Sequence, residues 1–207
     1  MEGASPHAQP RPGAALCTLA ELVAAGGKLC RRLPSGRGIV IWLLRPPTAG
    51  DAAVGAEVAA ADHLCYHHGG PLVDGDIEEL ALPPELSRAA GGRAAATVVL
   101  CPWHLYKIDV RSGACYYRGH DAELKSKGVR QRTHGVTIDA DGGVHVTESG
   151  GGGGGGSGDG GGSCAAAVPS DLPSDAYAHL PFRSGSEISP VGMHSSIASL
   201  GRARLPP

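Results

Sequence analysis

The sequence predicts an all-β fold, and three observations support it. Short apolar or β-branched runs recur along the chain with Gly or Pro between them, which is typical of sandwiches and barrels. Only residues 83–90 and 21–25 favour a helical turn. The part before the Gly-rich tract that starts at residue 150 has an ordinary globular composition and is long enough for a core.

The turn residues set where each expected strand ends. Pro46-Pro47 stops the third run, because proline cannot donate to a sheet and restricts the residue before it. Asp141-Gly142 suits the turn of a hairpin. Residues 83–90 are the best short-helix candidate, with Pro at the start and Gly91-Gly92 after the end. The expected strands are 15–17, 28–33, 39–44, 57–62, 97–100, 106–110, 135–139 and 143–147.

Composition divides the chain into four parts. Residues 1–13 are small and Pro-rich and predict a disordered tail, followed by one domain over 14–148. Residues 149–163 are mostly Gly and predict a flexible linker. Residues 164–207 are expected to be mostly disordered, although 171–183, with Tyr177 and the only Phe, could dock back on the domain.

Charge and cysteine content exclude several classes. A net charge of −2 gives no general attraction to nucleic acid or an anionic membrane, and no apolar run reaches the length of a membrane span. The six cysteines suggest no disulfide framework. We therefore expect a cytoplasmic protein, with organelle import left open.

Two short motifs carry most of the functional information. Cys65 and His67 form a Cys-x-His motif, and Cys101 and His104 form Cys-x-x-His. An expected strand runs directly into each motif, so we expect the two loops to lie side by side at one end of a sheet. Two sulfur and two nitrogen ligands can hold a tetrahedral zinc ion, or a two-iron cluster with Cys on one iron and His on the other.

The residues around these motifs resemble the ligand loops of Rieske iron–sulfur proteins. The matching segments are CYHHGGPL at 65–72 and CPWHLYKID at 101–109. With GDIE at 75–78 and KSKGVRQRTH at 125–134, the chain is most similar to the small soluble Rieske-type ferredoxins of eukaryotes over about residues 15–148. The resemblance implies a Rieske-type antiparallel β sandwich with a small cluster-binding subdomain.

The resemblance also implies one [2Fe–2S] cluster per chain. Cys65 and Cys101 would bind one iron as thiolates, and His67 and His104 would bind the other through Nδ1. The family's first-loop spacing selects His67 rather than His68. The 33 residues between His67 and Cys101 exceed the common family interval, which indicates an insertion at about residues 73–96.

Departures from the family pattern indicate a low reduction potential. Gly70 and Trp103 stand where high-potential members have a disulfide, and Tyr106 and Ile108 stand where those members have hydroxyl donors to cluster sulfur. Fewer donors stabilise the reduced cluster less, so we expect a potential of about −150 mV.

The leading functional hypothesis is a soluble, monomeric one-electron carrier rather than an enzyme. It would accept electrons from a flavin-dependent reductase and pass them to an oxygenase or another redox protein. The alternatives are an accessory subunit of a Rieske oxygenase or reductase, and a structural zinc module. The basic run at 125–132 is either a solvated face or a docking patch for an acidic partner.

Overall fold

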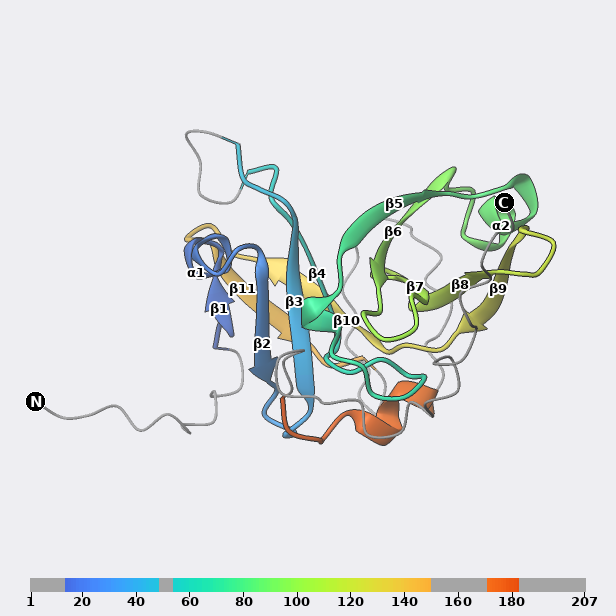
Figure 1. Ribbon diagram of the computed structural model, residues 1–207. Helices are drawn as coiled ribbons and strands as arrows, with labels where there is room; N and C mark the ends of the chain where they lie inside the picture. Colours follow the sequence, from blue (N-terminus) through green and yellow to red (C-terminus); the bar gives the residue numbers. More distant parts are fainter. Residues whose placement is uncertain (1–13, 49–53, 150–170, 183–207) are drawn as a thin grey trace, which may run out of the picture.

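The computed structural model describes residues 14–48, 54–149 and 171–182 (Figure 1). Two antiparallel sheets make up most of this part, which confirms the all-β prediction. The first sheet has the strand order β1 (Cys17–Thr18), β11 (Gly143–Thr147), β10 (Thr133–Ile138), β4 (Glu57–Asp62), β3 (Gly38–Arg45) and β2 (Lys28–Arg32). The second has the order β5 (Ile77–Ala81), β6 (Ala95–Leu100), β7 (Lys107–Asp109), β8 (Ala114–Arg118) and β9 (Leu124–Val129).

The helices are short. Helix α1 (Leu19–Ala24) starts at a capping box, in which Thr18 Oγ1 accepts from Glu21 N–H and Glu21 Oε2 accepts from Thr18 N–H. Helix α2 (Pro84–Ala89) lies in the predicted insertion with Pro at its start. Two 3₁₀ turns, η1 (Leu72–Asp74) and η2 (Pro173–Tyr177), complete the elements. No helix in the described ranges is long and apolar enough to cross a membrane.

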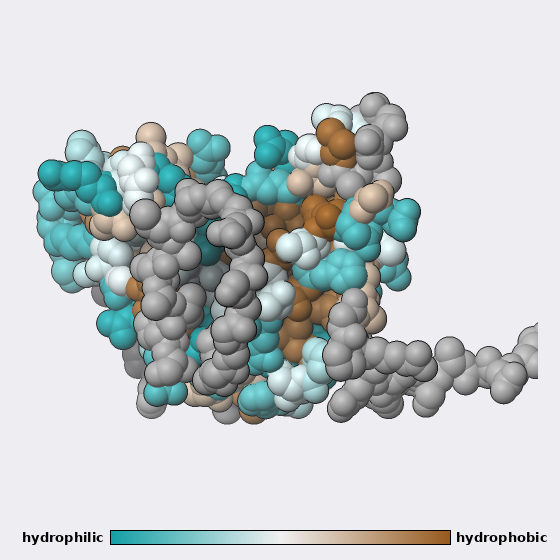
Figure 2. Space-filling view, turned by 180° about the vertical axis from the view of Figure 1, so that it is seen from behind, coloured by the Kyte–Doolittle hydropathy of each residue, from teal (hydrophilic) through white to brown (hydrophobic). Residues whose placement is uncertain are grey.

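Strand β3 is buried on both faces, which explains its unbroken apolar sequence. Val40 and Trp42 pack in a core that lies beside the ligand loops and includes Cys65 and Cys101. Alternate side chains point to opposite faces of a strand, so Ile39 and Ile41 enter a second core with Leu22 and Leu33. Partly buried side chains, among them Val136, Ile138 and Val146, pack against the second core. Hydrophobic residues reach the surface in the rear view (Figure 2).

The two strands that lead into the ligand motifs belong to different sheets, so the expectation of one shared sheet is wrong. Strand β4 leads to Cys65 from the six-stranded sheet, and β6 leads to Cys101 from the five-stranded sheet. The insertion contributes β5, which pairs with β6 from Ile77↔Val99 to Ala81↔Ala95 and forms one edge of the second sheet. The ligand loops therefore meet between the sheets.

Residues 171–182 pack against the domain. Within this segment Leu172, Ser174 and Ala178 are buried. Figure 1 shows the segment, in orange and red, beside the β2–β3 turn and beneath the loop that follows β4. The expected N-terminal tail at 1–13, nearly all of the expected linker, and residues 164–170 and 183–207 lie outside the described residues.

Candidate metal centre

The two ligand loops have the same backbone closure. In the first loop, Cys65 N–H donates to Gly70 O at 2.8 Å and Gly69 N–H donates to Cys65 O at 2.8 Å. In the second, Cys101 N–H donates to Tyr106 O at 2.9 Å and Leu105 N–H donates to Cys101 O at 2.9 Å. Each loop thus reverses the chain directly after a strand and holds its cysteine at the base of the turn.

The fourth residue after each cysteine has a positive φ, which the shared closure requires. Gly69 has φ 71° and Leu105 has φ 55°. Glycine adopts this conformation without strain, whereas a leucine there costs about 1–2 kcal/mol. The second loop therefore holds an apolar side chain in a strained position, and that side chain is 67% exposed.

Gly70 lets the two loops approach closely. A Cβ atom at Gly70 would lie 2.8 Å from Cys101 Sγ and 3.2 Å from Trp103 Cγ. Any side chain there would push the loops apart. Gly70 and Trp103 are therefore neighbours in space, and the Trp103 indole occupies the space next to Gly70 and Cys101.

The two thiols lie in the core beside each other. Cys65 is 0% exposed and Cys101 is 1% exposed. The hydrogen bond between their sulfur atoms and then burial raise the pKa of Cys65, while the same hydrogen bond lowers the pKa of Cys101. Backbone N–H groups of Trp103 and His104 also donate to the Cys101 sulfur and lower its pKa. Amide donors of this kind stabilise a thiolate, which is the form that binds metal.

His67 and His104 face each other at the outer side of the thiols. Their Nδ1 atoms are 3.3 Å apart, and the rings meet at 83° with centroids 4.8 Å apart. The His68 ring is farther from His104, at 5.5 Å between centroids, and is exposed. Burial and then the neighbouring imidazoles lower the pKa of His67, which favours the neutral ring that can bind a metal.

The donor set suits a cluster with two kinds of iron site. The two thiols pair in the core and the two imidazoles pair toward the surface, so the structure brings the four sequence-predicted residues together as two pairs. In the described part of the chain, no three His, Cys, Asp or Glu side chains converge on one point.

Gln131 supports the first loop and was missed by sequence reasoning. Its side chain is fully buried. Gln131 Oε1 accepts from Tyr66 N–H at 2.9 Å, and Nε2 donates to Asp62 O at 3.0 Å and Leu64 O at 2.9 Å. The available signal was an amide side chain between two arginines, Arg130 and Arg132.

Two tyrosines next to the ligands have partners away from the thiols. Tyr66 OH and Cys115 Sγ are 2.9 Å apart in the interior. The Tyr106 hydroxyl accepts a hydrogen bond from Lys127 Nζ at 2.8 Å. Neither hydroxyl is directed at a ligand sulfur by these contacts.

Comparison with known proteins finds a family model that matches the segment with both motifs. Residues 53–150 match the family model described as soluble Rieske-type ferredoxin. A human protein named Rieske domain-containing protein is 40% identical over 100 residues, which is 45% of this chain and 55% of that protein. The chain thus spans about half the length of this curated relative.

A solved structure gives a weaker likeness. The ferredoxin of carbazole 1,9a-dioxygenase from Nocardioides aromaticivorans IC177 is 20% identical, with a TM-score of 0.39 over 65% of this chain and 96% of that chain. The family model covers the segment that holds the two ligand loops, and residues 53–150 of this chain are similar to the soluble Rieske-type ferredoxins.

Proposed function

We propose that this protein is a one-electron carrier with one [2Fe–2S] cluster per chain. Cys65 and Cys101 would hold the inner iron, and His67 and His104 would hold the outer iron through Nδ1. The observation that carries the proposal is the facing pair of Nδ1 atoms, 3.3 Å apart, from the same two loops that hold the two buried thiols. The soluble Rieske-type ferredoxin family implies a cluster of this type, and the cluster supplies reversible one-electron chemistry.

The residues around the donors separate a dry interior from an accessible outer end. Cys65 and Cys101 are closed off from water by the core that contains Val40 and Trp42. His104 is exposed, and His67 is partly exposed. An electron would therefore enter and leave at the histidine end, where a partner can approach most closely.

The surface around His104 suits a protein partner. His68, Pro102, His104 and Leu105 are exposed together at the ends of the two loops. Lys127 and Arg130 lie in and beside edge strand β9, and in the described ranges neither pairs with a carboxylate, whereas neighbouring Lys125 pairs with Asp121. We propose that a flavin-dependent reductase, as donor, and an oxygenase or other redox protein, as acceptor, bind this end through an acidic face.

Electron paramagnetic resonance of anaerobically purified, dithionite-reduced protein tests the cluster. A rhombic signal averaging below the free-electron g value, with about two irons and two sulfides per chain, is expected. His67→Ala and His104→Ala should lose this signal, and the matched control His68→Ala should keep it. One zinc per chain with no signal would refute the proposal in favour of a structural zinc module.

A further inference from the structure

The segment at residues 171–182, here called the C-terminal clamp, is tied to the domain by a buried ion-pair cluster. Arg132 forms two bonds with Asp175, from Nε to Oδ1 at 2.7 Å and from Nη2 to Oδ2 at 2.6 Å. Arg37 Nη1 donates to the same Asp175 Oδ1 at 2.8 Å. The side chains of Arg132 and Arg37 are 1% and 10% exposed. One clamp carboxylate thus contacts two buried guanidinium groups of the domain.

Ser174 joins the clamp to Asp62 of strand β4, just before the first ligand loop. Ser174 is 0% exposed; its Oγ donates to Asp62 Oδ2 at 2.7 Å and accepts from Arg132 N–H at 2.9 Å. Asp62 is also 0% exposed, and its carboxylate accepts hydrogen bonds from Arg37 Nη1 and His134 Nε2. The serine therefore takes part in the same network as the two arginines.

The charges in this cluster are complementary. The guanidinium groups of Arg37 and Arg132 are removed from water, and the fully buried carboxylate of Asp62 pairs with Arg37. Glu148, which pairs with Arg37 Nε, is 36% exposed. A carboxylate partner stabilises a buried cation. Asp175 supplies such a carboxylate to both arginines from outside residues 14–148.

Backbone and ring contacts extend the clamp along strand β3. Gly38 N–H donates to Ala178 O at 2.7 Å, and Arg32 Nη2 donates to Leu180 O at 3.1 Å. The Phe182 ring packs edge-on against His63, with centroids 5.0 Å apart. The clamp is therefore attached at several points on both sides of Asp175.

One clamp residue touches the first ligand loop itself. A Cβ atom at Gly69 would lie 3.1 Å from Tyr177 Cδ1 and 3.4 Å from Cε1, so the tyrosine ring packs directly on this glycine. Gly69 has a positive φ and closes the loop by donating to Cys65 O. Glycine is the most mobile residue of a turn, and the ring limits that motion and excludes water from the turn.

We propose that the C-terminal clamp is an integral part of the domain and that Tyr177 is a positioning residue for the first ligand loop. The domain would then extend to residue 182 across the Gly-rich tract. The clamp would keep Cys65 and His67 in place by holding the Gly69 turn. This second part rests on the proposed function, whereas the first part does not.

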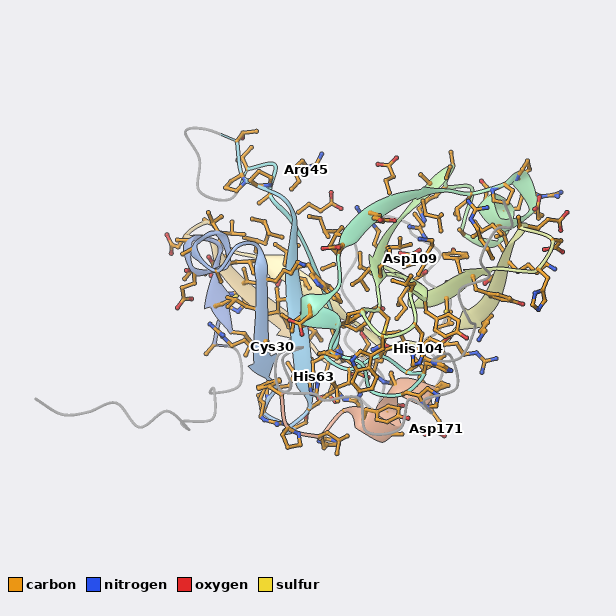
Figure 3. All side chains as sticks on the ribbon, in the orientation of Figure 1. Cys30, Arg45, His63, His104, Asp109 and Asp171 are labelled. Atoms are coloured by element: carbon orange, nitrogen blue, oxygen red, sulfur yellow. The ribbon has the colours of Figure 1, made fainter. Side chains whose placement is uncertain are left out.

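Hydrogen exchange and thermal unfolding of the full chain test the clamp. Asp175→Asn should lower the Tm and make the amides of Asp62 and Arg132 exchange roughly tenfold faster, because charge-assisted bonds to both arginines weaken. Asp171→Asn, an exposed carboxylate on the same segment (Figure 3), is the matched control and should behave as the wild type. Unchanged exchange and Tm in Asp175→Asn would overturn the proposal.

Tyr177→Ala tests the loop contact and also covers the case in which Asp175→Asn does not fold. We expect faster exchange at the Gly69 and Gly70 amides and severalfold faster iron release to a chelator, with Tyr177→Phe close to wild type. Phe182→Ala, at the other end of the clamp, should leave both rates unchanged. Wild-type rates in Tyr177→Ala would refute the positioning role. If the wild type holds no iron, the proposed function fails, while the exchange data still decide whether the clamp exists.

Discussion

Lys127 lies over the ring of Tyr106, with its Nζ atom 4.2 Å from the ring centroid and 2.8 Å from the hydroxyl oxygen. The same ring packs edge-on against His67, at 4.7 Å between centroids and 76°. One aromatic side chain therefore separates a cation from a proposed ligand. Strand β9 places the lysine there, and the loop that starts at Cys101 places the tyrosine.

We predict that Lys127→Met lowers the reduction potential. Reduction adds one negative charge to the cluster, and a nearby cation stabilises that charge by about 1 kcal/mol at a partly exposed site, or roughly 40 mV for one electron. A redox titration followed by electron paramagnetic resonance measures the shift. Lys127→Arg should keep the wild-type value, and so should Arg88→Met, which removes an exposed cation from α2. A potential unmoved by Lys127→Met would contradict the prediction.

Gln131 should be essential for the first ligand loop. Gln131→Leu removes three hydrogen bonds and leaves Tyr66 N–H and two carbonyls unpaired in the interior, which should cost about 2–4 kcal/mol of unfolding free energy. Urea unfolding and the iron content of the purified protein measure the effect.

A second substitution separates Gln131's two roles. Gln131→Glu keeps the acceptor for Tyr66 N–H but loses both donors, so it should also destabilise the loop. If the Gln131→Leu variant has the same stability and iron content as the wild type, the first ligand loop does not need the Gln131 side chain.

The parts that the sequence predicted correctly are those that local patterns encode. The expected strand at 57–62 is β4, and the hairpin around Asp141-Gly142 is β10 and β11. Each motif holds its Cys and His in one short loop. The two loops lie close together because the strands that precede them, β4 and β6, end near each other.

The parts that the sequence did not predict depend on long-range contacts or on strands with a solvent-exposed face. Strands β5 and β9 are sheet edges that contain charged residues, so they lack a strong apolar pattern. Gln131 and Lys127 act on loops more than 20 residues away in sequence. The C-terminal clamp is held mainly by polar groups, which hydrophobic patterns cannot reveal.

Leu105 should control the rate of electron exchange with a partner. Leu105→Asp places a charge at the tip of the second loop, where an apolar side chain is 67% exposed, and should slow reduction by a flavin-dependent reductase about tenfold. Leu105→Gly should slow it too while relieving the positive-φ strain, so its Tm should equal or exceed that of wild type. Stopped-flow reduction measures both variants.

The control for the loop tip is another exposed apolar residue. Val54 is 56% exposed in the β3–β4 connection. The reductase should reduce the Val54→Asp variant at the same rate as the wild type. If the wild type and Leu105→Asp are reduced at equal rates, the docking surface does not lie at the histidine end.

Acid should destabilise the domain through Asp62 and Asp175. Burial alone would raise both pKa values. Hydrogen bonds from His134, Arg37 and Ser174 outweigh it and lower the pKa of Asp62, and those from Arg132, Leu172 N–H and Arg37 lower that of Asp175. For a carboxyl whose pKa is lower when folded, the unfolded chain binds more protons. The stabilisation is therefore complete above the unfolded pKa of about 4 and is lost as the pH falls further.

Thermal unfolding from pH 7 downward should show a Tm that falls most steeply below about pH 5. Asp175→Asn should start from a lower Tm at neutral pH and fall less steeply, because one of the two carboxyls no longer titrates. Parallel curves for the variant and the wild type would mean that Asp175 does not contribute to acid sensitivity.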